Sequence, residues 1–165
     1  MIRFLALVLL AAASIASARA ETLRTYANDR FGATAEYPGD WRSDPPPENG
    51  DGLVFRSPDG QATITISGIL NIADSPDEAM RDEEKAYAGQ TVTFHQHGRR
   101  SVIVAGTQGD KIFYRKSILV CRDQIWNHVY LEYPAARKTE YDVLVAKVAG
   151  SLHFSGASEQ IPDCR

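Results

Sequence analysis

The chain has 165 residues, 44% of them hydrophobic, and a formal net charge of −3. This apolar fraction is enough for a buried core, and the absence of a basic run argues against a nucleic-acid partner. The mildly acidic balance likewise gives no indication of binding to anionic membranes.

The first 20 residues have the pattern of an export signal. Arg3 precedes an uncharged apolar run over 4–16, and residues 18–20 (Ala-Arg-Ala) have the small-x-small form of a signal-peptidase site. The run is shorter than the roughly 20 apolar residues that span a bilayer, and no later segment is apolar and long enough. We therefore expect a signal peptide over 1–20 with cleavage after Ala20. The mature domain, 21–165, is then periplasmic or secreted and carries no transmembrane segment.

The first half of the mature chain predicts four strands and a helix. Residues 57–60 (Ser-Pro-Asp-Gly) are a strong turn sequence and predict a hairpin. Ser75 and Glu78 have the spacing of a capping box, which begins a helix that we expect to end near Ala88, before Gly89. The predicted strands cover residues 22–26, 33–37, 53–56 and 62–69.

The second half predicts four sequential strands, which short turns join into an antiparallel meander. These strands cover residues 91–99, 101–105, 111–121 and 125–133. A second helix follows Pro134, because an apolar stripe recurs there at helical spacing. The whole pattern predicts an α+β fold, an antiparallel β-sheet of about six to eight strands with helices packed on it. The stripe consists of Tyr141, Leu144, Val145, Val148 and Leu152.

Both cysteines, Cys121 and Cys164, lie in the expected mature chain. An even number of cysteines in an exported protein favours a disulfide, and no Cys-x-x-Cys spacing supports a redox or metal pair. A bond between them closes a loop of about forty residues, which is worth about 4 kcal/mol in the chain-entropy model. We therefore predict a structural disulfide.

Short motifs at both ends of the mature chain resemble those of PsbP-like domains. Residues 26–32 have the form Tyr-x-Asn-x-x-Phe-Gly, and residues 37–41 the form Tyr-Pro-x-x-Trp. Residues 151–154 (Ser-Leu-x-Phe) follow the second helix in a similar way. The whole mature chain resembles more closely small exported bacterial proteins of unassigned function, which have runs like residues 47–52, 57–60 and 133–136. The resemblance implies an α/β/α sandwich with a central antiparallel sheet and a non-catalytic accessory or binding role.

His95 and His97 lie two residues apart in a predicted strand, so their side chains share one face with Thr93 and Arg99. Two imidazoles at this spacing are able to share a metal ion, although a zinc site needs three or four ligands. The alternative is a solvated strand face or a weak anion patch. The opposite face is expected to carry Val92, Phe94 and Gln96.

Trp126, His128 and Tyr130 share one face of the last predicted strand. One interpretation is an aromatic surface that binds a ligand or partner, with a titrating histidine at its centre. The other is that Trp126 and Tyr130 pack beneath a helix while His128 forms a hydrogen bond at its rim. The opposite face of this strand carries Val129, Leu131 and Tyr133.

Two functional hypotheses follow from these patterns. The first is a non-catalytic extracytoplasmic accessory or binding module of the cell envelope, monomeric and without a cofactor, whose partner is an envelope protein or a small ligand. The second is a small metal-assisted hydrolase that uses His95 and His97. No G-x-S-x-G, H-E-x-x-H, phosphate-loop or G-x-G-x-x-G motif occurs in the chain, so the first hypothesis is favoured.

Overall fold

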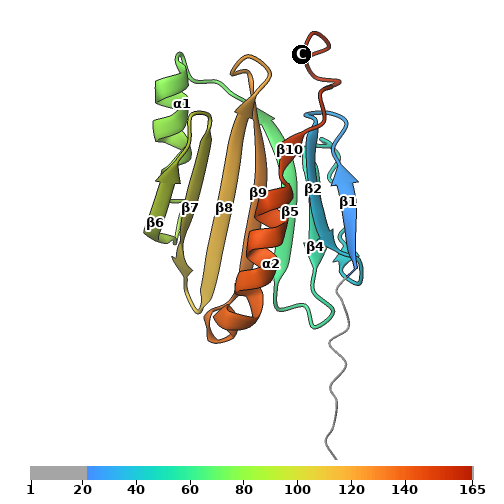
Figure 1. The fold of residues 1–165 in the computed structure, drawn as a ribbon, viewed down its shortest axis with the longest axis vertical. Coiled ribbons are helices and arrows are strands. Elements are labelled where there is room, and N and C mark those ends of the chain that lie inside the picture. The colour runs from blue at the N-terminus through green and yellow to red at the C-terminus, as the bar shows by residue number, and fades with distance from the viewer. Residues whose placement is uncertain (1–21, 165) are drawn as a thin grey trace, which may run out of the picture.

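Two antiparallel sheets and two helices make up residues 22–164, the part of the chain that the computed structural model describes (Figure 1). The expected signal peptide over 1–20 and its cleavage site lie outside these residues. The strands are β1 (Leu23–Ala27), β2 (Ala33–Pro38), β3 (Arg42–Ser43), β4 (Gly52–Arg56), β5 (Thr63–Leu70), β6 (Thr91–His97), β7 (Ser101–Gln108), β8 (Lys111–Val120), β9 (Ile125–Pro134) and β10 (His153–Phe154). The helices are α1 (Pro76–Glu83) and α2 (Lys138–Ser151).

The larger sheet has the strand order β3-β4-β5-β9-β8-β7-β6, and the smaller sheet the order β1-β2-β10. The predicted α+β fold with an antiparallel sheet and packed helices is confirmed, and the strands are divided between sheets of seven and three. All eight predicted strands are present, whereas the two-residue strands β3 and β10 were not predicted. Within the described residues, no helix combines the length and hydrophobicity required to cross a membrane.

One face of the seven-stranded sheet is covered by α2 and by the small sheet, as Figure 1 shows. The predicted apolar stripe of α2 is buried throughout and packs on Val129, Leu131 and Tyr133 of β9. Burial of such a stripe supplies most of the stability of a helix of this length. Trp41, directly before β3, also belongs to this core.

The opposite face of the large sheet is only partly covered, by α1. Ala79 is the one fully buried residue of this helix, and it packs with side chains of β7, β8 and β9. Ser75 caps the helix as predicted, since its hydroxyl accepts from the N–H of Glu78 at 3.2 Å. The predicted end near Ala88 is wrong, because α1 stops at Glu83. The guanidinium of Arg115 on β8 donates hydrogen bonds to the carbonyls of Glu83 and Lys85. These bonds turn the chain away from the helix after Glu83.

Cys121 and Cys164 form the predicted disulfide, which ties the tail after β10 to the end of β8. Phe31 and Ile125 pack around the bond in a small apolar cluster of their own. The turn that follows, between β8 and β9, has an uncommon backbone. Cys121, Arg122 and Asp123 have φ angles of 55°, 52° and 68°, so three consecutive non-glycine residues occupy the left-handed region.

Candidate binding site

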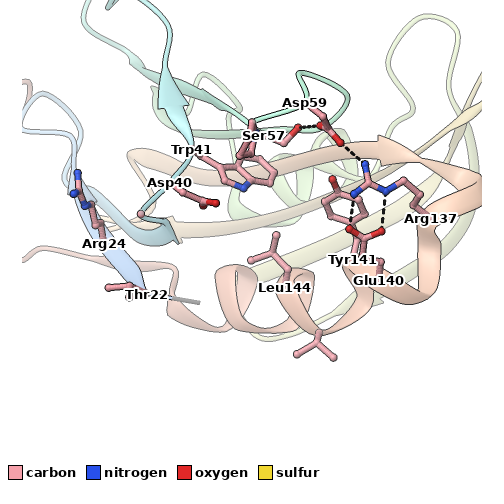
Figure 2. Close-up of a pocket in the computed structure, with 13 residues that line it drawn as sticks. Thr22, Arg24, Asp40, Trp41, Ser57, Asp59, Arg137, Glu140, Tyr141 and Leu144 are labelled. Atoms are coloured by element: carbon pink, nitrogen blue, oxygen red, sulfur yellow. Dashed lines mark hydrogen bonds and ion pairs between the residues drawn. The ribbon is translucent and has the colours of Figure 1, made fainter. Parts of the chain in front are cut away.

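A cleft of about 930 Å³ opens between the start of α2, the β4–β5 turn, β1 and the β2–β3 turn. Figure 2 shows its lining, with charged side chains on two sides and apolar ones between them. The apolar floor consists of Trp41, Tyr141 and Leu144, each less than one tenth exposed. These three side chains belong to the main core, so the floor of the cleft is rigid.

The first wall begins with Asp59, which the β4–β5 turn holds in a fixed orientation. The hydroxyl of Ser57 donates to Oδ1 of Asp59 at 2.6 Å, and the N–H of Gln61 donates to the same oxygen at 3.0 Å. These two hydrogen bonds and the nearby guanidinium of Arg137 lower the pKa of Asp59 to about 2. Asp59 is therefore a permanently charged side chain at ordinary pH.

Arg137 completes this wall between two carboxylates, as Figure 2 shows. Its Nη1 donates to Oδ2 of Asp59, and its Nε donates to Oε2 of Glu140 at 2.8 Å. The guanidinium also lies 5.1 Å from the centre of the Tyr141 ring. The hydrogen bonds from Arg137 lower the pKa of Glu140. This wall thus presents a fixed guanidinium with both carboxylates ionised.

The second wall carries Arg24 on β1 and Asp40 in the β2–β3 turn. The N–H of Gly39 donates to the carbonyl of Thr22 at 2.7 Å, and a Cβ at Gly39 would lie 2.8 Å from that oxygen. Glycine therefore allows the turn to approach β1 closely. Arg24 and Asp40 are exposed, and neither forms a salt bridge with another residue of 22–164. Both are available to a ligand.

The polar groups of the lining differ in how far they are already engaged. The hydroxyl of Ser57 donates to Asp59 and accepts the N–H of Ala62 at 3.0 Å, so its hydrogen-bonding groups serve the turn. Among the residues described, the lining of this cleft contains neither histidine nor cysteine. What it offers is charge of both signs around an aromatic floor, which suits a polar ligand or a charged segment of a partner.

The two histidines proposed as a metal site, His95 and His97, lie exposed on the edge strand β6 with ring centres 5.9 Å apart. Nδ1 of His97 lies 3.2 Å from a carboxylate oxygen of Glu84, just after α1. Within residues 22–164, no group of three or more histidine, cysteine or acidic side chains is placed to hold a metal ion. The structure therefore places one carboxylate beside His97, and no further ligand among the described residues joins the pair.

The expected alternation along β6 is wrong at Val92, because a β-bulge interrupts the pairing with β7. Val92 pairs with Gly106 and His95 with Val104, so Val92 lies on the same face as the two histidines. An extra residue in one strand reverses the alternation locally, and nothing in the local sequence marks it.

Trp126, His128 and Tyr130 lie on the α1 side of the sheet, as their spacing predicted, and the first and third pack into its core. Trp126 is 4% exposed, and the hydroxyl of Tyr130 accepts from Nε2 of Gln90 at 3.1 Å. Burial and the nearby Glu132 raise the pKa of Tyr130 to about 12. Trp126 and Tyr130 therefore pack against this core, and His128 is 12% exposed beside Glu83.

A buried ionic cluster lies beneath the end of α1 and was not predicted. Glu83 places Oε1 3.2 Å from Nε of Arg115 and 3.2 Å from Nε2 of His128, and it accepts the hydroxyl of Ser117 at 2.6 Å. Arg115 is 1% exposed, and its guanidinium lies 4.0 Å from the ring centre of Tyr87. These contacts hold α1 and the following residues on the sheet.

The sequence contains weak signals for the buried cluster around Arg115 and for the ion pairs of Arg137. In β8, Arg115 and Ser117 alternate in phase with Phe113 and Leu119, which places an arginine on a buried face. Arg137 and Glu140 have the i, i+3 spacing of a helical ion pair. Neither signal identifies the distant partner, Glu83 in the first case and Asp59 in the second.

Comparisons with known proteins identify the fold. No protein-family model matches the chain, and no curated protein sequence matches it. The solution structure of cyanobacterial PsbP (CyanoP) from Synechocystis sp. PCC 6803 is similar over 87% of this chain and 98% of that chain, with 14% identity and a TM-score of 0.61. The chain therefore has a PsbP-like fold, as the sequence motifs implied.

Two further solved structures are similar at lower TM-scores. LpqN, involved in cell envelope biogenesis of Mycobacterium tuberculosis, matches over 81% of this chain and 91% of its own, with 14% identity and a TM-score of 0.48. A protein from Bacteroides thetaiotaomicron matches over 74% of this chain, with 17% identity and a TM-score of 0.44. This chain spans 45% of the length of that protein.

Proposed function

We propose that residues 1–20 direct export with cleavage after Ala20, and that the mature chain is a non-catalytic binding module of the extracytoplasmic compartment. The signal-peptide pattern supports export. The bond between Cys121 and Cys164 suits an oxidising compartment, since disulfides persist there and are rare in the cytosol. The product is then periplasmic or secreted.

The charged cleft is the proposed binding site of this module. One observation carries the proposal: Arg24 and Asp40, which lack ionic partners within residues 22–164, face the fixed guanidinium of Arg137 across an aromatic floor. Because its two carboxylate partners hold the guanidinium of Arg137 in place before binding, ordering this group on binding costs little free energy. The occupant is a small polar ligand or a charged segment of an envelope protein.

Affinity purification from the extracytoplasmic fraction tests the site. The wild-type protein is compared with an Arg24→Gln/Asp40→Asn variant and with Arg42→Gln, an exposed arginine outside the cleft. We expect the wild type and Arg42→Gln to retain the same ligand or partner, and the double variant to retain at least fivefold less. Recovery of nothing, or equal recovery by all three proteins, contradicts a binding role for the cleft.

Mass spectrometry of the exported protein tests the compartment separately. We expect a product that begins at Glu21 and is recovered outside the cytoplasm. A full-length product confined to the cytoplasm contradicts the export proposal, whatever the cleft binds.

A further inference from the structure

Three segments meet at one end of the seven-stranded sheet, residues 69–72, 98–100 and 121–124, and we refer to them together as the sheet tip. The N–H of Asn71 donates to the carbonyl of Gln124 at 2.8 Å, and its side-chain amide donates to the carbonyl of Asp123 at 2.8 Å. The carbonyl of Arg100 accepts the N–H of Leu119 at 2.9 Å. Figure 1 shows the β8–β9 turn and the connection from β5 to α1 at this end, away from the start of α2.

The sheet tip exposes three apolar side chains within one short stretch of the chain. Ile69, Leu70 and Ile72 are 53%, 38% and 94% exposed. Scattered apolar residues on a surface are ordinary, but these three lie within four residues of each other. An isoleucine that is 94% exposed makes almost no contact with its own fold, so packing does not explain it.

The same surface is basic, although the chain as a whole is acidic. Arg99 and Arg122 are exposed and form no salt bridge with any residue of 22–164. Arg100 contacts both carboxylate oxygens of Asp123 at 3.0 Å, which neutralises the single acidic residue of the tip. Two further acidic residues lie close to the tip, Asp74, two positions after Ile72, and Asp163, next to the disulfide-bonded Cys164.

The backbone of the β8–β9 turn, which exposes Arg122, has an energetically unfavourable conformation. Cys121, Arg122 and Asp123 all have positive φ angles, a conformation that glycine adopts more readily. The disulfide of Cys121, the amide of Asn71 and the guanidinium of Arg100 hold the turn in this conformation. Strained residues that the surroundings fix in this way cluster at functional sites.

We propose that the sheet tip is a membrane-contacting surface that binds anionic lipid. Ile72 and its apolar neighbours insert among the headgroups, while Arg99 and Arg122 pair with lipid phosphates. The apolar side chains protrude, a shape that a fluid lipid layer accommodates without a complementary pocket. The net negative charge of the rest of the chain repels an anionic surface, so the tip also sets the orientation of the protein on the membrane.

Vesicle flotation tests this proposal with the exported, disulfide-bonded protein, whose N-terminus is first determined by mass spectrometry. The probes are vesicles of phosphatidylcholine alone and of phosphatidylcholine with phosphatidylglycerol, at low and high salt. Two variants alter the tip, Ile72→Ser and Arg122→Gln. Val143→Ser is the matched control, because Val143 is 63% exposed but lies on α2.

We expect the protein to float with the anionic vesicles at low salt and to dissociate from them at high salt. Ile72→Ser should weaken binding about tenfold and Arg122→Gln about fivefold, whereas Val143→Ser should leave it unchanged. The proposal is overturned if the protein floats with neither vesicle, if it floats equally with both, or if Ile72→Ser and Val143→Ser behave alike. A protein partner that binds the tip while vesicles do not also overturns it.

Discussion

Oε1 of Glu83 lies 3.2 Å from Nε2 of His128, so the last residue of α1 is held against the middle of β9. Both side chains are only 12% exposed. The same oxygen lies 3.2 Å from Nε of Arg115, which is almost completely buried. Since α1 contributes one fully buried residue, Ala79, its position depends on these polar contacts more than on apolar packing.

Replacing Glu83 by glutamine should therefore destabilise the fold by about 3 kcal/mol, because the charge of Arg115 is left buried without its counter-ion. Urea denaturation of the wild type and Glu83→Gln measures the difference. Glu84→Gln is the matched control. The carboxylate of Glu84 contacts the half-exposed His97, so this pair should contribute less than about 1 kcal/mol to the unfolding free energy. Equal losses in the two variants would argue against the buried cluster as the anchor of α1.

The pH dependence of stability should reveal the same carboxylate. Burial alone would raise the pKa of Glu83, but His128, Ser117 and Arg115 outweigh it and hold the pKa below its ordinary value of 4.5. The contribution of Glu83 is therefore complete above pH 4.5 and is lost as the pH falls through its lower value in the fold.

Urea denaturation between about pH 7 and about pH 3 measures this contribution. We expect the difference in unfolding free energy between the wild type and Glu83→Gln to narrow below pH 4.5. A difference that stays constant over the whole range is the contrary result.

The disulfide between Cys121 and Cys164 should stabilise the fold by about 4 kcal/mol, since it links residues separated by 43 positions. A Cys121→Ser/Cys164→Ser variant should show this loss in urea denaturation. Non-reduced peptide mapping of the wild type supplies the control and should recover the two cysteines in one linked peptide. Two free thiols in the exported protein would refute the bond itself.

Arg122 should be a residue whose replacement improves stability. With φ at 52°, Arg122→Gly relieves a left-handed conformation and should raise the unfolding free energy by about 1 kcal/mol. The melting temperature measures this gain. The same substitution should weaken vesicle binding, so stability and binding should move in opposite directions. A variant that loses stability would show that the arginine side chain serves the turn.

The histidine pair on β6 should not hold a metal ion tightly. The ring centres of His95 and His97 lie 5.9 Å apart, only His97 lies beside a carboxylate, that of Glu84, and a zinc site requires more ligands. Metal analysis of the purified protein should give less than one zinc per chain, unchanged in a His95→Ala/His97→Ala variant. One zinc per chain that disappears in this variant would instead support the hydrolase hypothesis.

The elements that the sequence predicted well are those with a local periodic signal. The stripe of α2 from Tyr141 to Leu152, the alternation of β9 and the turn at 57–60 each depend on residues that are close in the chain. The end of α1 depends instead on Arg115, which contacts the carbonyl of Glu83 from 32 positions away. No sequence pattern near Ala88 indicates this contact, so the sequence alone could not predict where the helix ends.

The candidate binding site was missed for the same physical reason. Arg137 meets Asp59 across 78 positions of sequence, and Arg24 reaches the same cleft only because β1 packs beside β2. Exposed charges of this kind have no hydrophobic period, so their spatial grouping follows from the topology of both sheets. The resemblance to PsbP-like domains supplied the fold but not the lining of the cleft.

β2 fastens the early and the late parts of the described chain to one another. β1 pairs along one edge of it, and β10 pairs along the other at Thr34 and Ala33. Ala33 and Ala35 of this strand are completely enclosed in the main core. A motor that unfolds the chain from its early end must therefore pull apart this shared strand before the interior gives way, whereas a pull on the late end passes first through the bond between Cys121 and Cys164.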